Sequence, residues 1–348
     1  MIDLLIDAPI LACPHDDLEE KQFNEEFLDF VTALSDISRF RRSVSSSRIW
    51  REASLASTLY MIDAYPFKHV LARAMPRLDP SLGFQLEDIA NLALALLSKS
   101  NCLNDVSDLE DVVVENGEIT DDPIPSRGPE LTNYACRATE FAFSHLGAEK
   151  ALPSSIRFVS RAPKTENTTS IVRYSLTMAS YRDGSMQCPE INREVKMTYF
   201  YGTEFTLRNL DPSLIWMKAD EPSLLDALAI FAANQGDISH FELAEFKKNI
   251  KIGNSMLDSC QNHGFLHEPT KVRRLIAACV DICLGRNLDQ SHWLRKGKGP
   301  GEPQKGRGGN DFAWRHDIDH DFHLHYWKDG VVIELANVVV HNDFRIAE

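Results

Sequence analysis

The chain lacks the features of a secreted or membrane-spanning protein. Its seven cysteines are scattered and odd in number, and no Cys-x-x-Cys pair occurs. This pattern argues against a disulfide framework and favours a reducing compartment. No apolar run in the sequence is long enough to span a membrane, for which about 20 residues are needed. We therefore expect a cytoplasmic protein that has no membrane partner.

The chain also lacks the positive charge of a protein that coats nucleic acid with its whole surface. Its formal net charge is -14, and a surface of that sign repels a polyanion. Residues 1–130 hold 24 Asp and Glu against 11 Lys and Arg, whereas residues 131–348 hold 27 against 26. The first 210 residues contain no Gly-rich phosphate loop and no sustained repeat. The acidic excess therefore belongs to the N-terminal part, to which the sequence assigns no chemistry.

The chain contains enough apolar residues for two domains. Of its 348 residues, 43% are hydrophobic and 25% are charged, as in ordinary globular proteins. The pattern predicts an α+β fold, with a helix-rich N-terminal domain at 1–210 and a second domain at 211–348. In the first domain we expect helices near 23–34, 47–62, 83–98 and 130–147, and a small antiparallel sheet from strands at 156–160, 169–180 and 195–201.

Residues 101–130 interrupt the first domain. They carry eight Asp or Glu before Pro123, followed by Pro125 and Pro129, and they show no periodic apolar pattern. Such a composition is typical of a solvated segment. We therefore predict an acidic linker at 101–130.

In the second domain the pattern predicts a strand, three helices and three antiparallel strands. The expected elements are a strand at 214–216, helices at 222–234, 241–262 and 269–285, and strands at 312–318, 322–327 and 331–340. Asp329-Gly330 separates the last two strands and is a strong tight-turn signal. This order of elements predicts a domain in which helices pack on an antiparallel sheet.

Histidines and tryptophans are concentrated in this sheet. Six of the twelve histidines and three of the five tryptophans fall between Ser291 and His341. Because side chains alternate along a strand, one face should present imidazoles and the other should build the core. The expected imidazole face carries His323, His325 and Trp327, and the expected core face carries Phe322, Leu324 and Tyr326. We expect Trp293, Trp314 and Trp327 to pack in or beside the core, and His316 and His320 to lie on the surface.

Four short motifs follow one another in this region. They are the loop Gly297–Pro303, the strand sequence Trp314-Arg315-His316-Asp317-Ile318, the strand sequence His323-Leu324-His325-Tyr326, and His341. In order and spacing, roughly the last 55 residues resemble the YoeB-like branch of the RelE/ParE toxin superfamily, whose members are small ribosome-associated mRNA interferases. The resemblance implies a RelE-like domain that binds RNA, acts with the ribosome and uses no cofactor.

The resemblance also implies roles for single residues. Glu302 would take the proton of the 2′-hydroxyl, His341 would protonate the leaving 5′-oxygen, and His323 and Arg315 would stabilise the charged transition state. The residues expected to hold the RNA are Lys296, Lys298, Lys305, Arg307 and His325. The segment from Leu294 to Arg315 has six Lys and Arg against two acidic residues, a balance that suits a polyanion. The chain differs from the family pattern at two positions. His323 stands where the family has an arginine, and Asn342 stands where the family has its terminal aromatic residue.

Two alternatives use the same residues. His323, His325 and His341 could form a zinc site with an open position, which would make the protein a zinc-dependent hydrolase. The C-terminal domain could also be a catalytically inactive module that binds RNA or the ribosome. Because the family members are much smaller than this chain, the N-terminal domain is expected to bind a protein partner or antitoxin. By analogy the whole protein would be a conditional effector in bacterial stress response or phage defence.

Overall fold

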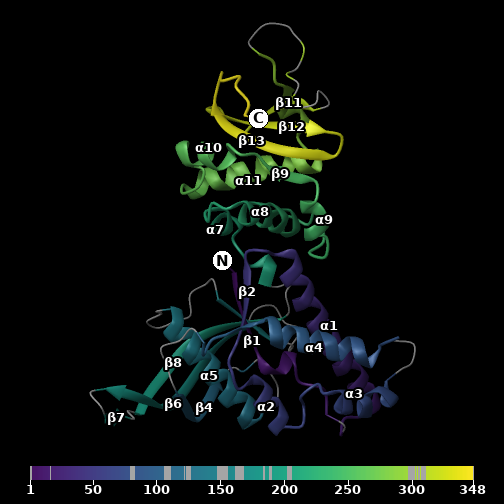
Figure 1. Cartoon of the computed structure of the whole chain (residues 1–348), viewed down its shortest axis with the longest axis vertical. Coiled ribbons are helices and arrows are strands. Elements are labelled where there is room, and N and C mark those ends of the chain that lie inside the picture. Colours follow the sequence, from purple (N-terminus) through teal and green to yellow (C-terminus); the bar gives the residue numbers. More distant parts are fainter. Residues whose placement is uncertain are drawn as a thin grey trace. The chain divides into compact units, whose positions relative to one another are not determined.

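The chain divides into two compact units, each of which combines helices with a sheet (Figure 1). The computed structural model describes residues 2–15, 17–78, 83–105, 111–120, 122, 127–146, 156–160, 168–182, 185–187, 190–201, 206–296, 302, 304, 306 and 311–347. Residues 2–41 and 47–206 form what we call the N-terminal unit, and residues 1, 42–46 and 207–348 form the C-terminal unit. The mixed α+β class predicted from the sequence is confirmed. No helix built from the described residues is both long enough and apolar enough to cross a membrane.

The described residues of the N-terminal unit form an eight-stranded sheet that is half parallel. Its order is β3-β2-β1-β5-β8-β6-β4, with β7 paired to β6. The strands are β1 (Ile2–Ile6), β2 (Ser47–Arg51), β3 (Asn101–Cys102), β4 (Asp111–Thr120), β5 (Ile156–Ser160), β6 (Thr168–Arg182), β7 (Ser185–Gln187) and β8 (Glu190–Tyr201). The first five strands of this order, from β3 to β8, run parallel, whereas β6 and β4 are antiparallel. The strands predicted at 156–160, 169–180 and 195–201 are present, and β6 pairs antiparallel with β8 as expected. The sheet is larger than predicted and partly parallel, because β1 to β3 were not recognised.

Helices in this unit connect the parallel strands. They are α1 (Glu20–Ser43), α2 (Leu55–Met61), α3 (Lys68–Ala74), α4 (Leu86–Lys99) and α5 (Pro129–Leu146), with short 3₁₀ turns η1 (Ala8–Ile10) and η2 (Met75–Arg77). The apolar stripe of α1 is core as predicted, since Phe23, Phe27, Phe30 and Leu34 are fully buried. The helices predicted at 83–98 and 130–147 are confirmed. The helix predicted at 47–62 was wrong in its first half, which is β2.

The acidic segment 101–130 is not a linker in its described part. Residues Asp111–Thr120 form β4, which pairs with β6 at the end of the sheet, and the register shifts between Glu115 and Glu118. Asn116 lies inside this irregularity with a left-handed φ of 51°. A strand at a sheet edge has one side open to water and tolerates acidic residues. That location explains why the composition resembled a solvated segment.

One ion-pair network in the N-terminal unit is almost completely buried. The guanidinium of Arg127 donates to both carboxylate oxygens of Asp7 at 2.8 and 2.9 Å and to Asp122 at 2.7 Å. The side chains of Arg127 and Asp7 are 2% and 0% exposed. Asp7 follows β1, so this network attaches the segment after β4 to the carboxyl end of the parallel sheet.

We predict that Arg127→Met destabilises the N-terminal unit by roughly 3–5 kcal/mol, because the Asp7 carboxylate then stays buried without its cation. Chemical denaturation followed by circular dichroism measures this loss. Arg173→Met is the matched control, since its ion pair with Glu194 is exposed and screened by water, so that its loss should change little. Equal destabilisation by the two substitutions would contradict a special role for the buried Arg127–Asp7 ion pair.

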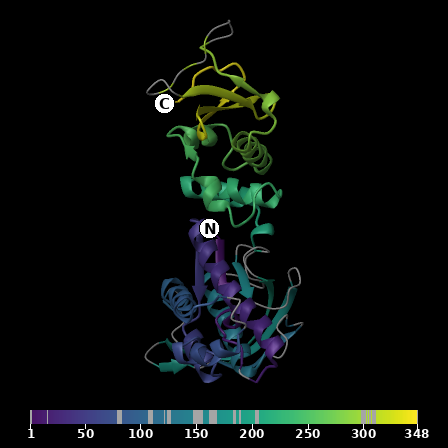
Figure 2. The same ribbon diagram turned by 90° about the vertical axis from the view of Figure 1, so that its right-hand side faces the viewer.

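The C-terminal unit has three layers (Figures 1 and 2). A five-stranded sheet of order β10-β11-β12-β13-β9 forms one layer in the described residues. Helices α10 and α11 cover one face of it, and α8 packs on α11, α7 and α9. The elements are α7 (Pro212–Trp216), α8 (Glu221–Asn234), α9 (Leu243–Lys247), β9 (Ile250–Ile252), α10 (Met256–Asn262), α11 (Pro269–Leu284), η4 (Leu288–Gln290), β10 (Ser291–Trp293), β11 (Phe312–Asp317), β12 (Phe322–Asp329) and β13 (Val332–Val340).

Most elements predicted for this unit are confirmed, and two were wrong. The helices at 222–234 and 269–285 and the three C-terminal strands are present, and Gly285 ends α11 with a left-handed φ of 66°. Residues 214–216 belong to helix α7 rather than to a strand, because Asp211 caps the helix and Pro212 occupies its first turn. The helix predicted at 241–262 is interrupted by β9, which pairs in parallel with β13.

Buried polar groups fasten the helical layers of the C-terminal unit. Trp216 is completely buried and donates its indole N–H to the carbonyl of Phe265 at 2.9 Å. The carboxylate of Asp226, on α8, accepts from Lys247 Nζ at 2.5 Å and from the backbone N–H of Ser46 at 2.7 Å. The hydrogen bond from Ser46 to Asp226, whose carboxylate is also paired with Lys247, thus attaches residues 42–46 to this unit.

Candidate functional site

The edge strand β10 places polar side chains on the uncovered face of the C-terminal sheet. It pairs antiparallel with β11, so that His292 is opposite Arg315 and Trp293 is opposite Trp314. Directly opposed residues in such a pair point to the same face, and successive residues point to opposite faces. His292 and Arg315 therefore share one face, and the two tryptophans share the other. This strand was not predicted from the sequence, and His292 was missed with it.

A groove of about 720 Å³ lies along this edge of the sheet. The described residues that line it are Ser291, His292, Trp293, Leu294, Arg295, Trp314, Arg315, His341, Asn342 and Phe344. Two arginines and two histidines are among them, and none of the ten is acidic. The groove therefore brings together two of the predicted site residues, Arg315 and His341, and adds Arg295 and His292. Cations and imidazoles without a carboxylate form a surface suited to phosphate groups.

The ring of His341 lies between two other histidine rings. Its ring centroid is 4.8 Å from that of His323 and 6.2 Å from that of His320. His323 Nδ1 lies 2.9 Å from a carboxylate oxygen of Asp317. Burial lowers the pKa of His323, although Asp317 acts in the opposite direction, so that this ring is neutral near pH 7. The ring of His323, which faces Asp317, thus packs against the ring of His341.

His323 and His325 share one face of β12 as predicted, but both side chains are buried. The alternation along β12 is as predicted, yet His323 and His325 are 2% and 0% exposed. The ring of His323 is therefore turned away from water, and direct contact with a phosphate, as the resemblance implied, does not fit its burial. His316 is also buried, at 1% exposure, and bonds to Ser291 Oγ at 2.8 Å, so the prediction that it lies on the surface was wrong.

The last residues of the chain cover His325. We call residues 341–347 the C-terminal tail. His325 Nδ1 donates to the carbonyl of Arg345 at 3.0 Å, and Trp327 Nε1 donates to the carbonyl of Ala347 at 2.8 Å. Phe344 and Ile346 pack on a small apolar cluster that contains Trp327. Burial lowers the pKa of His325 to about 4. His325 thus anchors the tail, and a direct contact with RNA is not compatible with this docked position.

The three histidines proposed as a zinc set do not form one. Within the part of the chain that the structure describes, no three His, Cys, Asp or Glu side chains are grouped so as to hold a metal ion. His325 already uses Nδ1 for the tail, and His323 faces Asp317. The described residues therefore give no support to the zinc-hydrolase alternative.

The basic loop before β11 is described only in part. Lys296 is exposed, whereas Lys298, Lys305 and Arg307 lie outside the described residues. Glu302 is exposed and does not belong to the groove wall. Gln304, two residues further on, donates its side-chain N–H to the carbonyls of Arg295 at 3.0 Å and Phe344 at 2.9 Å. Gln304 thus connects Arg295 and Phe344, which both line the groove.

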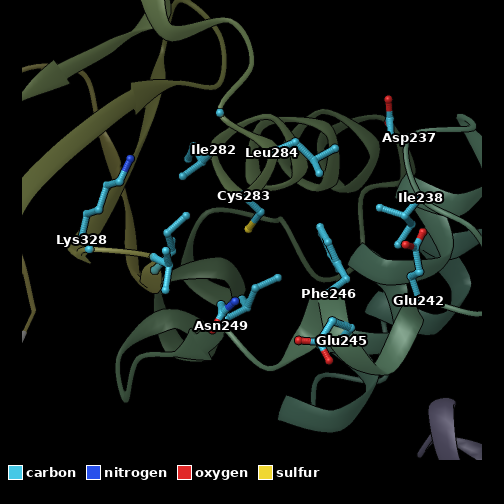
Figure 3. A pocket seen from close by; sticks show the side chains of 15 residues that line it. Asp237, Ile238, Glu242, Glu245, Phe246, Asn249, Ile282, Cys283, Leu284 and Lys328 are labelled. Atoms are coloured by element: carbon cyan, nitrogen blue, oxygen red, sulfur yellow. The ribbon is translucent and has the colours of Figure 1, made fainter.

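A second cavity, of about 560 Å³, lies between α9, the end of α11 and the turn after β12 (Figure 3). Its lining is mixed, and its residues Asp237 and Glu245 are paired with Arg286 and Lys248 respectively. The thiol of Cys283 also lines it (Figure 3). Because burial raises the pKa of this thiol to about 12, it stays protonated and is a poor nucleophile at neutral pH. The groove, in contrast, is lined by two arginines and by two exposed histidines.

No protein-family model, no curated protein and no solved structure matches the chain. The resemblance to YoeB-like toxins therefore rests on the motifs quoted above. The chemistry of the groove has to be argued from its own residues.

We predict that docking of the tail is sensitive to acid. The pKa of His325, about 4 in the folded chain, lies below the ordinary value of 6.5, so as the pH falls below about 6.5 the unfolded state binds a proton that the folded state does not. Stability that is fully present above pH 6.5 is lost as the pH falls from there to 4, by up to about 3 kcal/mol.

Urea denaturation midpoints of the C-terminal unit at neutral and acid pH measure this loss. His325→Gln should remove most of it, whereas His320→Gln, at a side chain that is 98% exposed, should leave it unchanged. If the His325→Gln variant loses the same amount of stability between neutral and acid pH, another group causes the loss.

Proposed function

We propose that the C-terminal unit is an endoribonuclease that holds a single strand of RNA in the groove between β10, β11 and the C-terminal tail. The observation that carries the proposal is the convergence of Arg295, Arg315, His292 and His341 on one groove, with no acidic residue among its described lining residues. The arginines supply fixed positive charge for phosphate oxygens, and His341 supplies a titratable group beside them.

The reaction that fits these groups is attack by a 2′-hydroxyl on the adjacent phosphorus. A bond forms between O2′ and phosphorus, and the bond from phosphorus to O5′ breaks. A base accepts the 2′-hydroxyl proton, and His341 as the imidazolium gives a proton to O5′. Arg315 neutralises the non-bridging oxygens, whose charge grows in the transition state. The products are a 2′,3′-cyclic phosphate and a 5′-hydroxyl end.

Asp317 and His323 would support this step without touching the RNA. The carboxylate of Asp317 lies 2.9 Å from Nδ1 of His323, and His323 is the neighbour of His341. The ring of His323 packs against that of His341 at 4.8 Å between centroids and itself faces Asp317. Their role is to position His341.

Association with the ribosome and action as a conditional effector belong to the same proposal. The division into two compact units fits an N-terminal unit that binds a protein partner and a C-terminal unit that cuts RNA. Induction of the intact chain in bacteria should arrest growth, and induction of the His341→Ala variant should not.

We expect RNA binding to depend on the groove arginines. Arg295→Gln should weaken the binding of a single-stranded oligoribonucleotide and lower the slope of log K against log salt concentration by about 0.7, since one phosphate contact is lost. Arg273→Gln, which removes an exposed arginine on α11, should leave affinity and slope unchanged. Fluorescence anisotropy over a salt series provides both values.

We expect cleavage to require His341 and to continue in EDTA. His341→Ala should reduce the cleavage rate on the order of 100-fold or more, the scale of a positioned acid, while affinity for the oligoribonucleotide is retained. Gel analysis of end-labelled RNA, alone and with translating ribosomes, measures the rate. No cleavage by the unaltered protein under either condition would leave an RNA-binding module and refute the nuclease.

A further inference from the structure

The groove contains a second imidazole to which the resemblance assigns no role. His292 is exposed, lies on the edge strand β10 and lines the groove together with His341. Its direct partner across the ladder is Arg315. An exposed histidine that shares a sheet face with the arginine of a phosphate site is placed to exchange protons with a ligand bound there.

The sheet register fixes the order of the three groups. Arg315, on β11, is paired with His292 on β10 and with His325 on β12. His323 lies on the same face as His325, two residues away, and supports the ring of His341 at 4.8 Å. Neighbouring strands are about 4.8 Å apart. The order across the face is therefore His292 on β10, then Arg315 on β11, then the ring of His341 against His323 of β12, so that the position of Arg315 lies between the two imidazoles.

This order matches the geometry of in-line displacement at phosphorus. The attacking and leaving oxygens lie on opposite sides of the phosphorus atom, so the base and the acid must approach from opposite sides. A phosphate bound to Arg315 would have His292 on one side and His341 on the other. Glu302, the base implied by the resemblance, is exposed and outside the groove wall.

We infer that His292 is the general base of the proposed ribonuclease and that it acts in place of Glu302. Neutral His292 accepts the proton of the 2′-hydroxyl as O2′ attacks phosphorus, and the imidazolium of His341 gives its proton to O5′ as that bond breaks. After turnover the two histidines have exchanged protonation states, and each is restored by exchange with water. The substrate class is single-stranded RNA, because DNA lacks the 2′-hydroxyl. This inference rests on the proposed function.

The first test compares single substitutions in the full chain. His292→Gln should reduce cleavage of a single-stranded oligoribonucleotide on the order of 100-fold or more, and Glu302→Gln should leave the rate within about threefold of the unaltered protein. His267→Gln, at an exposed histidine between α10 and α11, is the matched control and should have no effect. Far-ultraviolet circular dichroism and RNA affinity report whether each variant keeps its fold and its groove.

The second test separates base from acid with a substrate whose 5′-oxygen is replaced by sulfur. A thiolate leaves without being protonated, so this substrate does not need a general acid. It should restore cleavage by His341→Ala to near the rate of the unaltered protein, and it should not restore cleavage by His292→Gln.

The outcomes that overturn the inference differ from those that overturn the nuclease. If the unaltered protein cleaves RNA and His292→Gln cleaves equally well, His292 is not the base and the nuclease stands. If Glu302→Gln loses cleavage and His292→Gln does not, Glu302 in the loop is the general base. Rescue of His292→Gln by the sulfur substrate would make His292 the acid. Absence of cleavage by the unaltered protein, with and without ribosomes, is failure of the proposed function itself.

Discussion

The register of the antiparallel strands β10 to β12 is the constraint on which the candidate site depends. Because opposed residues share a face, one pairing scheme places His292 beside Arg315 and His323 beside Asp317. A slip of one residue would move each of these side chains to the helix-covered face. The apolar residues Leu324 and Tyr326, which are buried on that face, oppose such a slip. The same burial that stabilises the sheet therefore also aligns its polar groups.

Burial divides the histidines of the sheet into two chemical classes. His316, His323 and His325 are nearly inaccessible to water, and the loss of hydration lowers the pKa of each. His316 hydrogen-bonds to Ser291, His325 hydrogen-bonds to the tail, and the ring of His323 lies beside Asp317. His292 and His341 are exposed at the groove and are free to exchange protons with a ligand. Residue type alone does not distinguish the classes, since both occur within one stretch of the sequence.

The sequence predicted the strands that carry a clear pattern and missed those that do not. Residues 312–340 contain aromatic and β-branched runs separated by the Asp329-Gly330 turn, so their strands were recognised. The strand β1 does not alternate, because Asp3, Leu4, Leu5 and Ile6 are all buried, as in parallel strands covered on both faces, and β10 has only three residues. Arg315 and His341 were selected by their motifs and do line the groove. His292 could not be selected, because its place in the site depends on a pairing across more than twenty intervening residues. The burial of His323 and His325 depends on the tail, which carries no recognisable pattern.

The C-terminal tail behaves as a tethered ligand of its own sheet. Its carbonyls are bound by His325 and Trp327, while His341, Asn342 and Phe344 from the same segment form one wall of the groove. Contacts that would be weak between separate molecules are sufficient here, because the covalent connection gives the tail a high effective concentration. Docking of the tail and occupation of the groove are consequently linked equilibria. Any molecule that binds the completed groove favours the docked tail, and by reciprocity a docked tail increases affinity for that molecule to the same extent.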